Sequence, residues 1–389
     1  MQINRRRMLQ LAAAGVAAGF FNHKVLAETQ PITAQTTFTL PSAEHPLLLN
    51  FNENSLGMSA SARQAVINHL NLSNRYPDSE REGLIEDIAK RFNLNTENVG
   101  LGNGSSEAIE AVISGWIQQA NDKKQAVQVI APDPTFGIYE DYAAARNVPV
   151  VKVPLKEDLS FDLDAIRSKA DQFDGISIIY LCNPNNPTAL LTPNSQLAPW
   201  LDNIPENHRL LIDEAYAEYA EGDPQFTSAI EWARKGTERL AVTRTFSKLY
   251  ALAGLRIGYM VAAKSEMDYL RQFLSADNIN LTAAVAARAT LADNAFLQES
   301  RRVTDESRRM VMKALDELGL TYVASSANFI FHRIKGDSVE YAKRMKAYNI
   351  VVGRPFPPLT NYNRLTLGTP EEMAYLIQVW KEFRTKGWI

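Results

Sequence analysis

Residues 245–259, which read TFSKLYALAGLRIGY, place one lysine among hydroxyl and guanidinium groups. Lysine forms Schiff bases with carbonyl compounds when an apolar or cationic setting keeps its amine partly neutral. Lys248 has no carboxylate close to it in the sequence, and Thr245, Ser247 and Arg256 are donors suited to a phosphate group. The stretch therefore predicts a lysine that binds a phosphorylated aldehyde, and pyridoxal phosphate is the cofactor that fits.

Two polar clusters elsewhere follow apolar runs and could serve the same cofactor. Residues 176–182 and 210–213 read as strands of a parallel sheet, and they end in NPNNPT and DEAY. Ligands of an open α/β sheet bind at the carboxyl ends of its strands. Asp213, if not simply a helix cap, can keep a pyridine nitrogen protonated, which makes the ring an electron sink. Tyr216 and Asn186 can hydrogen-bond the ring's phenolate oxygen.

These motifs together resemble those of the fold-type I pyridoxal phosphate-dependent aminotransferases, and the histidinol-phosphate aminotransferase branch most of all. The matching patterns are the lysine segment with G-x-R-x-G at residues 254–258, N-P-N-N-P-T with D-E-A-Y, and L-N-x-N-E-N at residues 49–54. The resemblance runs from about residue 48 to 369. One departure is Ala189, where the family usually has glycine, and we expect it to alter a turn without removing a ligand.

The resemblance implies a role for each matching residue. It implies that Lys248, Asp213 and Tyr216 are catalytic. It implies that the cofactor is bound by Ser105, Ser106, Phe136, Asn186, Asp213, Tyr216, Thr245, Ser247, Lys248 and Arg256, with Tyr76 reaching in from a neighbouring subunit. It also implies that the substrate is bound by Arg364, Arg354, Asn328 and Asn54.

Several of these residues have plainer interpretations when the residues are considered alone. The glycine and serines at residues 102–106 can be a helix cap for residues 108–119, and Phe136 can be a core aromatic. Arg364 lies inside an apolar strand and needs an anionic partner, which can be a protein carboxylate as well as a substrate. Tyr76 can be an ordinary surface residue.

The fold class expected from these patterns is α/β. The resemblance implies fold type I, with a large domain around a mostly parallel seven-stranded sheet and a smaller α/β domain. We place the large pyridoxal phosphate-binding domain at residues 76–283 and the small domain at residues 47–75 plus 284–389. The resemblance further implies a homodimer with shared active sites.

Composition narrows the classes of partner. The chain has 389 residues and a formal net charge of −3, with no basic tail, so nothing points to nucleic acid. Cys182 is the single cysteine, and the five histidines lack metal-ligand spacing. We therefore predict no disulfide framework and no metal site.

The first 27 residues are typical of a twin-arginine signal peptide. Asn4 is followed by three arginines, and an apolar run at residues 9–21 leads to a small-residue cleavage site at residues 25–27. Residues 28–46 read as a linker arm. We expect a periplasmic or secreted protein with no membrane role beyond export; if residues 1–27 are instead a disordered start or an interfacial anchor, a cytoplasmic location is the alternative.

The resemblance implies transamination between an amino donor and a 2-oxo acid. The donor is an L-amino acid or an amino-alcohol phosphate such as histidinol phosphate. Because export does not suit histidine biosynthesis, we expect a general or specialised amino-acid aminotransferase. A lyase or decarboxylase similar to threonine-phosphate decarboxylase shares the cofactor residues and stays open, as does an exported protein that binds the cofactor or an amino compound without turnover.

Overall fold

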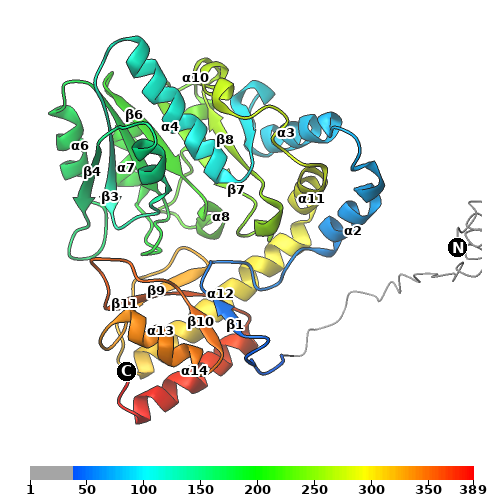
Figure 1. Ribbon diagram of the computed structural model, residues 1–389, viewed down its shortest axis with the longest axis vertical. Coiled ribbons are helices and arrows are strands. Elements are labelled where there is room, and N and C mark those ends of the chain that lie inside the picture. Colours follow the sequence, from blue (N-terminus) through cyan, green and yellow to red (C-terminus); the bar gives the residue numbers. More distant parts are fainter. Residues whose placement is uncertain (1–37) are drawn as a thin grey trace, which may run out of the picture. The chain divides into compact units, whose positions relative to one another are not determined.

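The computed structural model describes residues 38–389. The largest sheet of this part of the chain has seven strands (Figure 1). Strand β8 runs antiparallel to both of its neighbours, and the other neighbouring strands pair in parallel. The predicted α/β class with a mostly parallel seven-stranded sheet is confirmed. The strands, in spatial order, are β2 (Val99–Gly102), β8 (Gly258–Ala262), β7 (Leu240–Thr245), β6 (His208–Asp213), β5 (Ile176–Cys182), β3 (Val127–Asp133) and β4 (Val150–Pro154).

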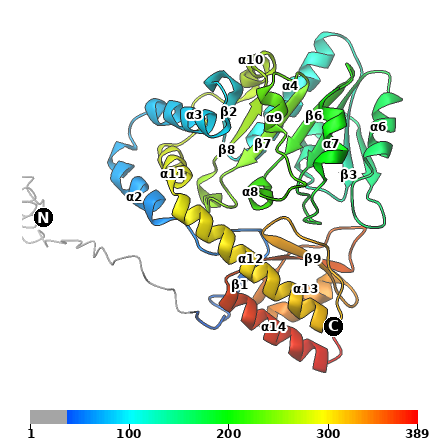
Figure 2. The ribbon, with the colours of Figure 1, turned by 180° about the vertical axis from the view of Figure 1, so that it is seen from behind.

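Helices cover both faces of this sheet because its central strands are apolar on both sides. Three helices pack on the face seen in Figure 1: α4 (Ser105–Asp122), α5 (Ile138–Ala144) and α10 (Lys264–Leu270). The opposite face, seen in Figure 2, is covered by α3 (Asp78–Phe92), α6 (Leu163–Asp171), α7 (Asn194–Leu201), α9 (Ile230–Arg234) and α11 (Leu281–Ala292). The short helix α8 (Ala217–Ala220) follows β6.

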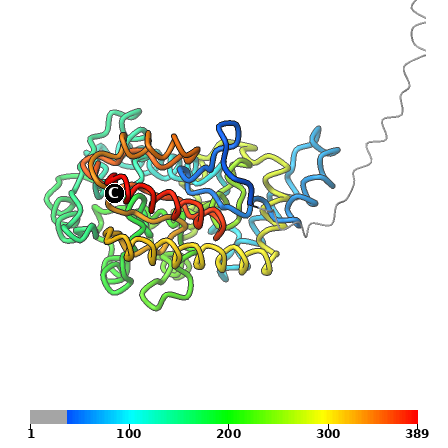
Figure 3. Tube along the Cα trace, turned by 90° about the horizontal axis from the view of Figure 1, so that it is seen from below, coloured from blue at the N-terminus to red at the C-terminus, as the bar shows by residue number. Residues whose placement is uncertain are grey.

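The C-terminal part of the chain builds a second, smaller α/β layer (Figure 3). Strand β1 (Leu47–Leu49) pairs in parallel with β10 (Ile350–Val352), and β9 (Phe329–Arg333) pairs antiparallel with β11 (Tyr362–Thr366). Their apolar side chains share a core with α12 (Asn294–Glu317), α13 (Ser338–Lys346) and α14 (Pro370–Thr385).

The entry segment contributes to both apolar cores. Leu47 and Leu49 belong to the C-terminal core, whereas Ala62 of α2 (Ala60–His69) belongs to the core of the large sheet. Ser59 caps α2, because its Oγ accepts from the Ala62 amide at 3.1 Å. The domain boundaries at residues 75/76 and 283/284 stay a prediction. The predicted signal peptide and residues 28–37 of the linker arm lie outside the described residues.

No helix within residues 38–389 has the length and apolar character needed to cross a membrane. In the described part of the chain, 3₁₀ turns at Leu70–Leu72, Thr96–Asn98, Ala253–Leu255 and Arg271–Phe273 connect the longer elements.

A buried ionic cluster joins the ends of β6 and β7. Arg244, the penultimate residue of β7, contacts Glu214 at 2.8 Å and Glu218 at 3.2 Å, and all three side chains are 1% exposed. Glu214 also accepts from the hydroxyl of Ser228 at 2.6 Å. Arg301 of α12 donates to the backbone carbonyl of Glu218 at 2.9 Å. The cluster therefore links the sheet edge to the helix that leads into the small layer.

We expect Arg244→Met to lower the free energy of unfolding by about 3–5 kcal/mol, because two buried carboxylates lose their cation. Urea unfolding followed by circular dichroism measures the change. Arg302→Gln is the control, because Arg302 pairs with Glu299 and Glu306 on the exposed side of α12 and should leave the unfolding midpoint almost unchanged. Equal losses in the two variants would contradict the assignment.

Candidate active site

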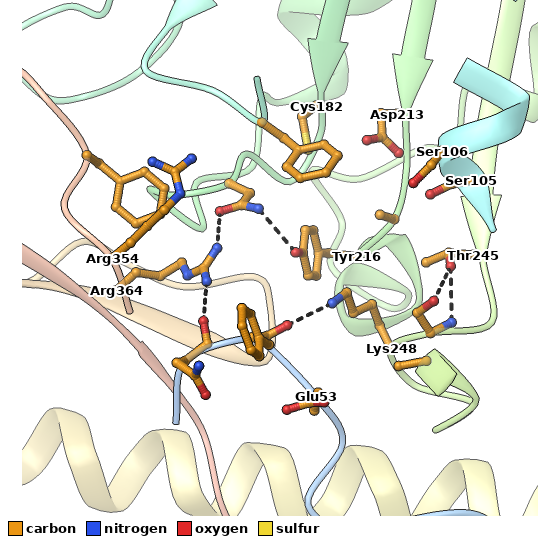
Figure 4. Close-up of a pocket in the computed structure, with 18 of the residues that line it drawn as sticks. Glu53, Ser105, Ser106, Cys182, Asp213, Tyr216, Thr245, Lys248, Arg354 and Arg364 are labelled. Atoms are coloured by element: carbon orange, nitrogen blue, oxygen red, sulfur yellow. Dashed lines mark hydrogen bonds between the residues drawn. The ribbon is translucent and has the colours of Figure 1, made fainter. Parts of the chain in front are cut away.

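A cavity of about 550 Å³ lies at the carboxyl ends of β5, β6 and β7, and residues of the small layer close its other side (Figure 4). This position follows from topology, because the polar residues after parallel strands collect at one edge of the sheet. The lining residues are Asn50, Phe51, Glu53, Ser105, Ser106, Phe136, Cys182, Asn186, Asp213, Ala215, Tyr216, Thr245, Ser247, Lys248, Ala253, Arg256, Val352, Arg354, Phe356 and Arg364.

One end of the cavity is built from groups that can donate hydrogen bonds to an anion. Ser105 and Ser106 are the first residues of α4, so their backbone amides are free of helical partners. Thr245 Oγ1 donates to Ser247 Oγ at 2.9 Å, and Arg256 Nη1 donates to the same oxygen at 3.4 Å. A side chain at Gly104, whose φ is +78°, would collide with the Arg256 guanidinium. Glycine at this position therefore allows Arg256 to approach the start of α4 closely. The donors gathered here are suited to a phosphate group, and this end of the cavity is called the phosphate site below.

Asp213, the last residue of β6, is buried in the cavity wall with 1% of its surface exposed. Its carboxylate accepts from the hydroxyls of Tyr180 at 2.8 Å and Thr243 at 3.2 Å. Burial raises its pKa to about 6. Within residues 38–389 no basic side chain forms an ion pair with it. A buried carboxylate that faces a cavity and has no cationic partner of its own fits a protonated ring nitrogen of a bound cofactor.

Lys248 lies between the phosphate site and the small layer (Figure 4). Its Nζ donates to the carbonyl of Phe51 at 3.0 Å and lies 5.7 Å from the Tyr216 ring centroid. Burial, together with the positive charges of Arg364 and Arg256, lowers the pKa of the amine to about 8. A substantial fraction of the amine is therefore neutral near pH 8, as a nucleophilic lysine requires.

A chain of amide and hydroxyl groups connects Tyr216 with the small layer. The Tyr216 hydroxyl accepts from Asn52 at 3.0 Å and from Asn186 at 3.4 Å. Asn52 is fully buried, and its backbone is in the left-handed region with φ of 55°. Its backbone amide donates to the hydroxyl of Thr366 in β11. Because two amide groups occupy its lone pairs, the Tyr216 hydroxyl keeps its proton free to donate into the cavity.

The end opposite the phosphate site carries two arginines (Figure 4). Arg364 of β11 is 8% exposed, and it donates to Asn186 Oδ1 at 2.8 Å and to the Asn50 carbonyl. These acceptors are neutral, and among the described residues no carboxylate pairs with Arg364. The ring of Phe356 contacts both guanidinium groups. Its centroid lies 5.1 Å from Cζ of Arg364 and 4.3 Å from Cζ of the exposed Arg354.

Most of the predicted site residues line this one cavity, and three do not. The side-chain amide of Asn54 donates to the Leu249 carbonyl at 2.9 Å and to the Ser300 hydroxyl. The side-chain amide of Asn328 donates to the Asn52 carbonyl at 3.0 Å. Tyr76 is 78% exposed. None of the three is among the cavity's lining residues, and the site roles implied for them stay predictions.

The sequence did not single out several cavity residues. Asn50, Phe51 and Glu53 come from the loop after β1, and their motif L-N-x-N-E-N was the available signal. Phe356 follows Arg354 by two residues, in a proline-rich segment without periodicity. Tyr180 and Thr243 contact Asp213 from neighbouring strands, and only the strand register brings them together.

The departure at Ala189 lies in a strained turn. Ala189 is fully buried with φ of 62°, a conformation that costs an alanine on the order of 1 kcal/mol and a glycine much less. Its amide donates to the Asn185 carbonyl at 2.7 Å, and its side chain is absent from the cavity lining. The altered residue therefore affects a turn and removes no ligand group.

Comparisons with known proteins agree with this architecture. The sequence model of the family "Aminotransferase class I and II" matches residues 44–379. The histidinol-phosphate aminotransferase of Moorella thermoacetica is 32% identical over 85% of this chain and 83% of its own. Histidinol-phosphate aminotransferase 2 of Ralstonia nicotianae is 34% identical over 84% of this chain and 85% of its own.

A solved structure from Erwinia carotovora atroseptica, which carries the histidinol-phosphate aminotransferase name provisionally, has a TM-score of 0.86 at 36% identity. That match covers 91% of this chain and 100% of the other. The histidinol-phosphate aminotransferase of Clostridium acetobutylicum has a TM-score of 0.77 at 26% identity and covers 87% and 99%. The chain therefore belongs to the class I and II aminotransferases, and it is a fold-type I enzyme that works with pyridoxal phosphate.

Proposed function

We propose that this aminotransferase takes an amino donor that carries an anionic group, with histidinol phosphate as the first donor to test. The observation that carries the proposal is Arg364, a buried guanidinium at the cavity wall that contacts only neutral acceptors within residues 38–389. A buried cation is stable when an anion completes its environment. A substrate carboxylate or phosphate supplies that anion, and the exposed Arg354 adds positive charge at the same end.

The residues divide the work between cofactor and substrate. Ser105, Ser106 and Arg256 would hold the cofactor's phosphate, Asp213 its ring nitrogen and Tyr216 its ring oxygen. When bound, pyridoxal phosphate supplies a protonated ring that withdraws electrons from the substrate's α-carbon. Lys248, with its partly neutral amine, would take a proton from that carbon and return it.

Two observations favour different amino donors. The relatives from Moorella thermoacetica and Ralstonia nicotianae are named for histidinol phosphate, which combines an amine with a phosphate. The predicted export favours L-amino acids, whose carboxylate also suits Arg364. A decarboxylase of the same fold is less favoured, because these relatives are aminotransferases by name.

Arg364→Leu tests the anionic-donor proposal. We expect single-turnover reaction with histidinol phosphate, or with the best L-amino acid, to slow by at least about a hundredfold, because a charged hydrogen-bonded contact is lost. The loss of the cofactor's visible absorbance after addition of donor, and its return with 2-oxoglutarate, measures the reaction. Histidinol without phosphate is the matched donor.

Equal rates for histidinol and histidinol phosphate, with no faster L-amino acid, would contradict recognition of an anion. Release of carbon dioxide from an amino acid donor while the cofactor's absorbance persists would indicate a decarboxylase.

We propose further that the enzyme is a homodimer in which Tyr76 completes the phosphate site of the partner. Tyr76 lies outside its own chain's cavity lining, and its side chain is exposed. The exposed large apolar side chains of the same part of the chain include Ile67, Leu70 and Leu72, which suit burial by a second copy.

Mixing of inactive variants tests the shared site. Lys248→Ala and Tyr76→Ala subunits, each weak or inactive alone, should regain about a quarter of wild-type activity when unfolded and refolded together at equal amounts, because each hybrid dimer has one intact site. Light scattering measures the mass. A monomeric mass, or no recovery in hybrids that are shown to form, would contradict the proposal.

We also propose export through the twin-arginine route, which carries folded proteins and so suits an enzyme that acquires its cofactor first. The support is the sequence of residues 1–27 alone. Arg5→Lys with Arg6→Lys preserves charge and should retain the protein in the cytoplasm, as measured by cell fractionation. Cytoplasmic location of the unaltered chain with an intact N-terminus would contradict export.

A further inference from the structure

We propose that Tyr180 and Thr243 are positioning residues that hold the Asp213 carboxylate in the orientation and the ionised form that the cofactor's ring nitrogen requires. Neither residue touches the cavity, so each would act only through Asp213. The proposal rests on the assignment of pyridoxal phosphate as the cofactor.

The geometry comes from the register of three neighbouring strands. Asp213 of β6 lies opposite Cys182 of β5 and opposite Thr243 of β7. Tyr180 precedes Cys182 by two residues and therefore points to the same face of the sheet. Both flanking strands thus present a hydroxyl to the carboxylate that ends the strand between them.

Each carboxylate oxygen receives its own hydroxyl donor. Tyr180 Oη lies 2.8 Å from Oδ2, and Thr243 Oγ1 lies 3.2 Å from Oδ1. The backbone amide of Ala215 donates to the same carboxylate. An ionised carboxylate only accepts hydrogen bonds, whereas a protonated one must also donate. This arrangement of donors therefore stabilises the ionised form against the cost of burial.

The Tyr180 hydroxyl is held as a donor. Its side chain is fully buried, and its ring stacks on Tyr139 of α5 with centroids 5.0 Å apart and an interplanar angle of 26°. Burial raises the pKa of Tyr180 well above its ordinary value, so the hydroxyl keeps its proton. Stacking fixes the ring, and the ring fixes where the hydroxyl points.

Other charged and titratable groups around Asp213 have different partners. Glu214 raises the pKa of Asp213 through its charge, but it is paired with Arg244. The Cys182 thiol donates to the Pro184 carbonyl at 3.3 Å, and burial raises its pKa. Tyr216 and Lys248 face Asp213 from the cavity side. Burial raises the pKa of Tyr216 and lowers that of Lys248, and the charge of Asp213 adds to the first shift and opposes the second. The direct donors to the carboxylate are thus Tyr180, Thr243 and the Ala215 amide.

Binding of pyridoxamine phosphate to the cofactor-free full-length protein, measured by calorimetry between pH 5 and 9, tests the proposal. This probe cannot form a Schiff base with Lys248, so the amine of Lys248 does not complicate the reading. In the wild type, affinity should fall as the pH drops through about 6, where Asp213 becomes protonated.

Tyr180→Phe should weaken binding at pH 7 about tenfold, because a hydrogen bond to a charged group is lost. It should also move the fall in affinity to higher pH, because loss of a donor to the charged form raises the pKa of a carboxyl group. Thr243→Val should change both quantities in the same direction and by less, and it provides a second variant should Tyr180→Phe fold poorly.

Tyr139→Phe is the matched control, since it removes a hydroxyl from the ring stacked on Tyr180 without touching Asp213. It should leave the pH profile unchanged. In an Asp213→Asn background, Tyr180→Phe should have little further effect, because its action passes through the carboxylate.

A uniform loss at every pH, or an equal loss in the Asp213→Asn background, would overturn the positioning role. Wild-type protein that fails to bind pyridoxamine phosphate at any pH would instead overturn the cofactor assignment on which the proposal rests.

Discussion

A carboxylate buried at the end of the central strand β6 is the constraint around which this enzyme is built. Asp213 has hydroxyl and amide donors from its own sheet, but none of them is a cation. Burial without a positive partner raises its pKa to about 6, and a protonated ring nitrogen would supply the missing cation. The protein therefore carries an anionic site that a cationic cofactor ring would stabilise.

The rest of the cavity distributes charge around this carboxylate. Donors from α4 and from the segment after β7 form an anion site at one end, and the two arginines form another at the opposite end. Lys248 lies between them, and positive charge from Arg256 and Arg364 adds to burial in lowering its pKa. The same arginines that suit anionic ligands thus help to keep the amine nucleophilic.

The two layers of the protein are coupled through the loop after β1. Lys248 donates to the Phe51 carbonyl, Arg364 to the Asn50 carbonyl, and Asn52 to Tyr216. This loop connects cofactor residues of the large sheet with β11 of the small layer. The buried cluster of Arg244 and Glu214 lies next in sequence to Thr245 and Asp213 of the cavity wall. Polar contacts therefore hold the cavity both at the loop after β1 and at the ends of β6 and β7.

The residues predicted to bind the cofactor lie in short motifs, and the structure brings most of them to one cavity. Lys248 with its hydroxyl neighbours, and Asp213 at the end of an apolar run, could be recognised without a structure. The run at residues 176–182 was expected as a strand and is β5 (Ile176–Cys182). Ser105 and Ser106 were open to a plainer interpretation, and the structure places them in the cavity wall beside Thr245 and Ser247.

Other features depended on contacts between residues far apart in the chain. Asn54 shares a motif with cavity residues, yet its amide is directed to the Leu249 carbonyl and the Ser300 hydroxyl. Phe356 came to the cavity from a segment without periodicity, where backbone direction cannot be inferred from side-chain type.

The sequence by itself determined the family, the order of the strands along the chain and the residue types that carry the chemistry, because local patterns of apolar and polar residues encode them. The tertiary structure alone decided which neighbours those residues have. Tyr180 and Thr243 meet Asp213 only because β5, β6 and β7 pair in one register, and a shift by one residue would turn both hydroxyls to the other face.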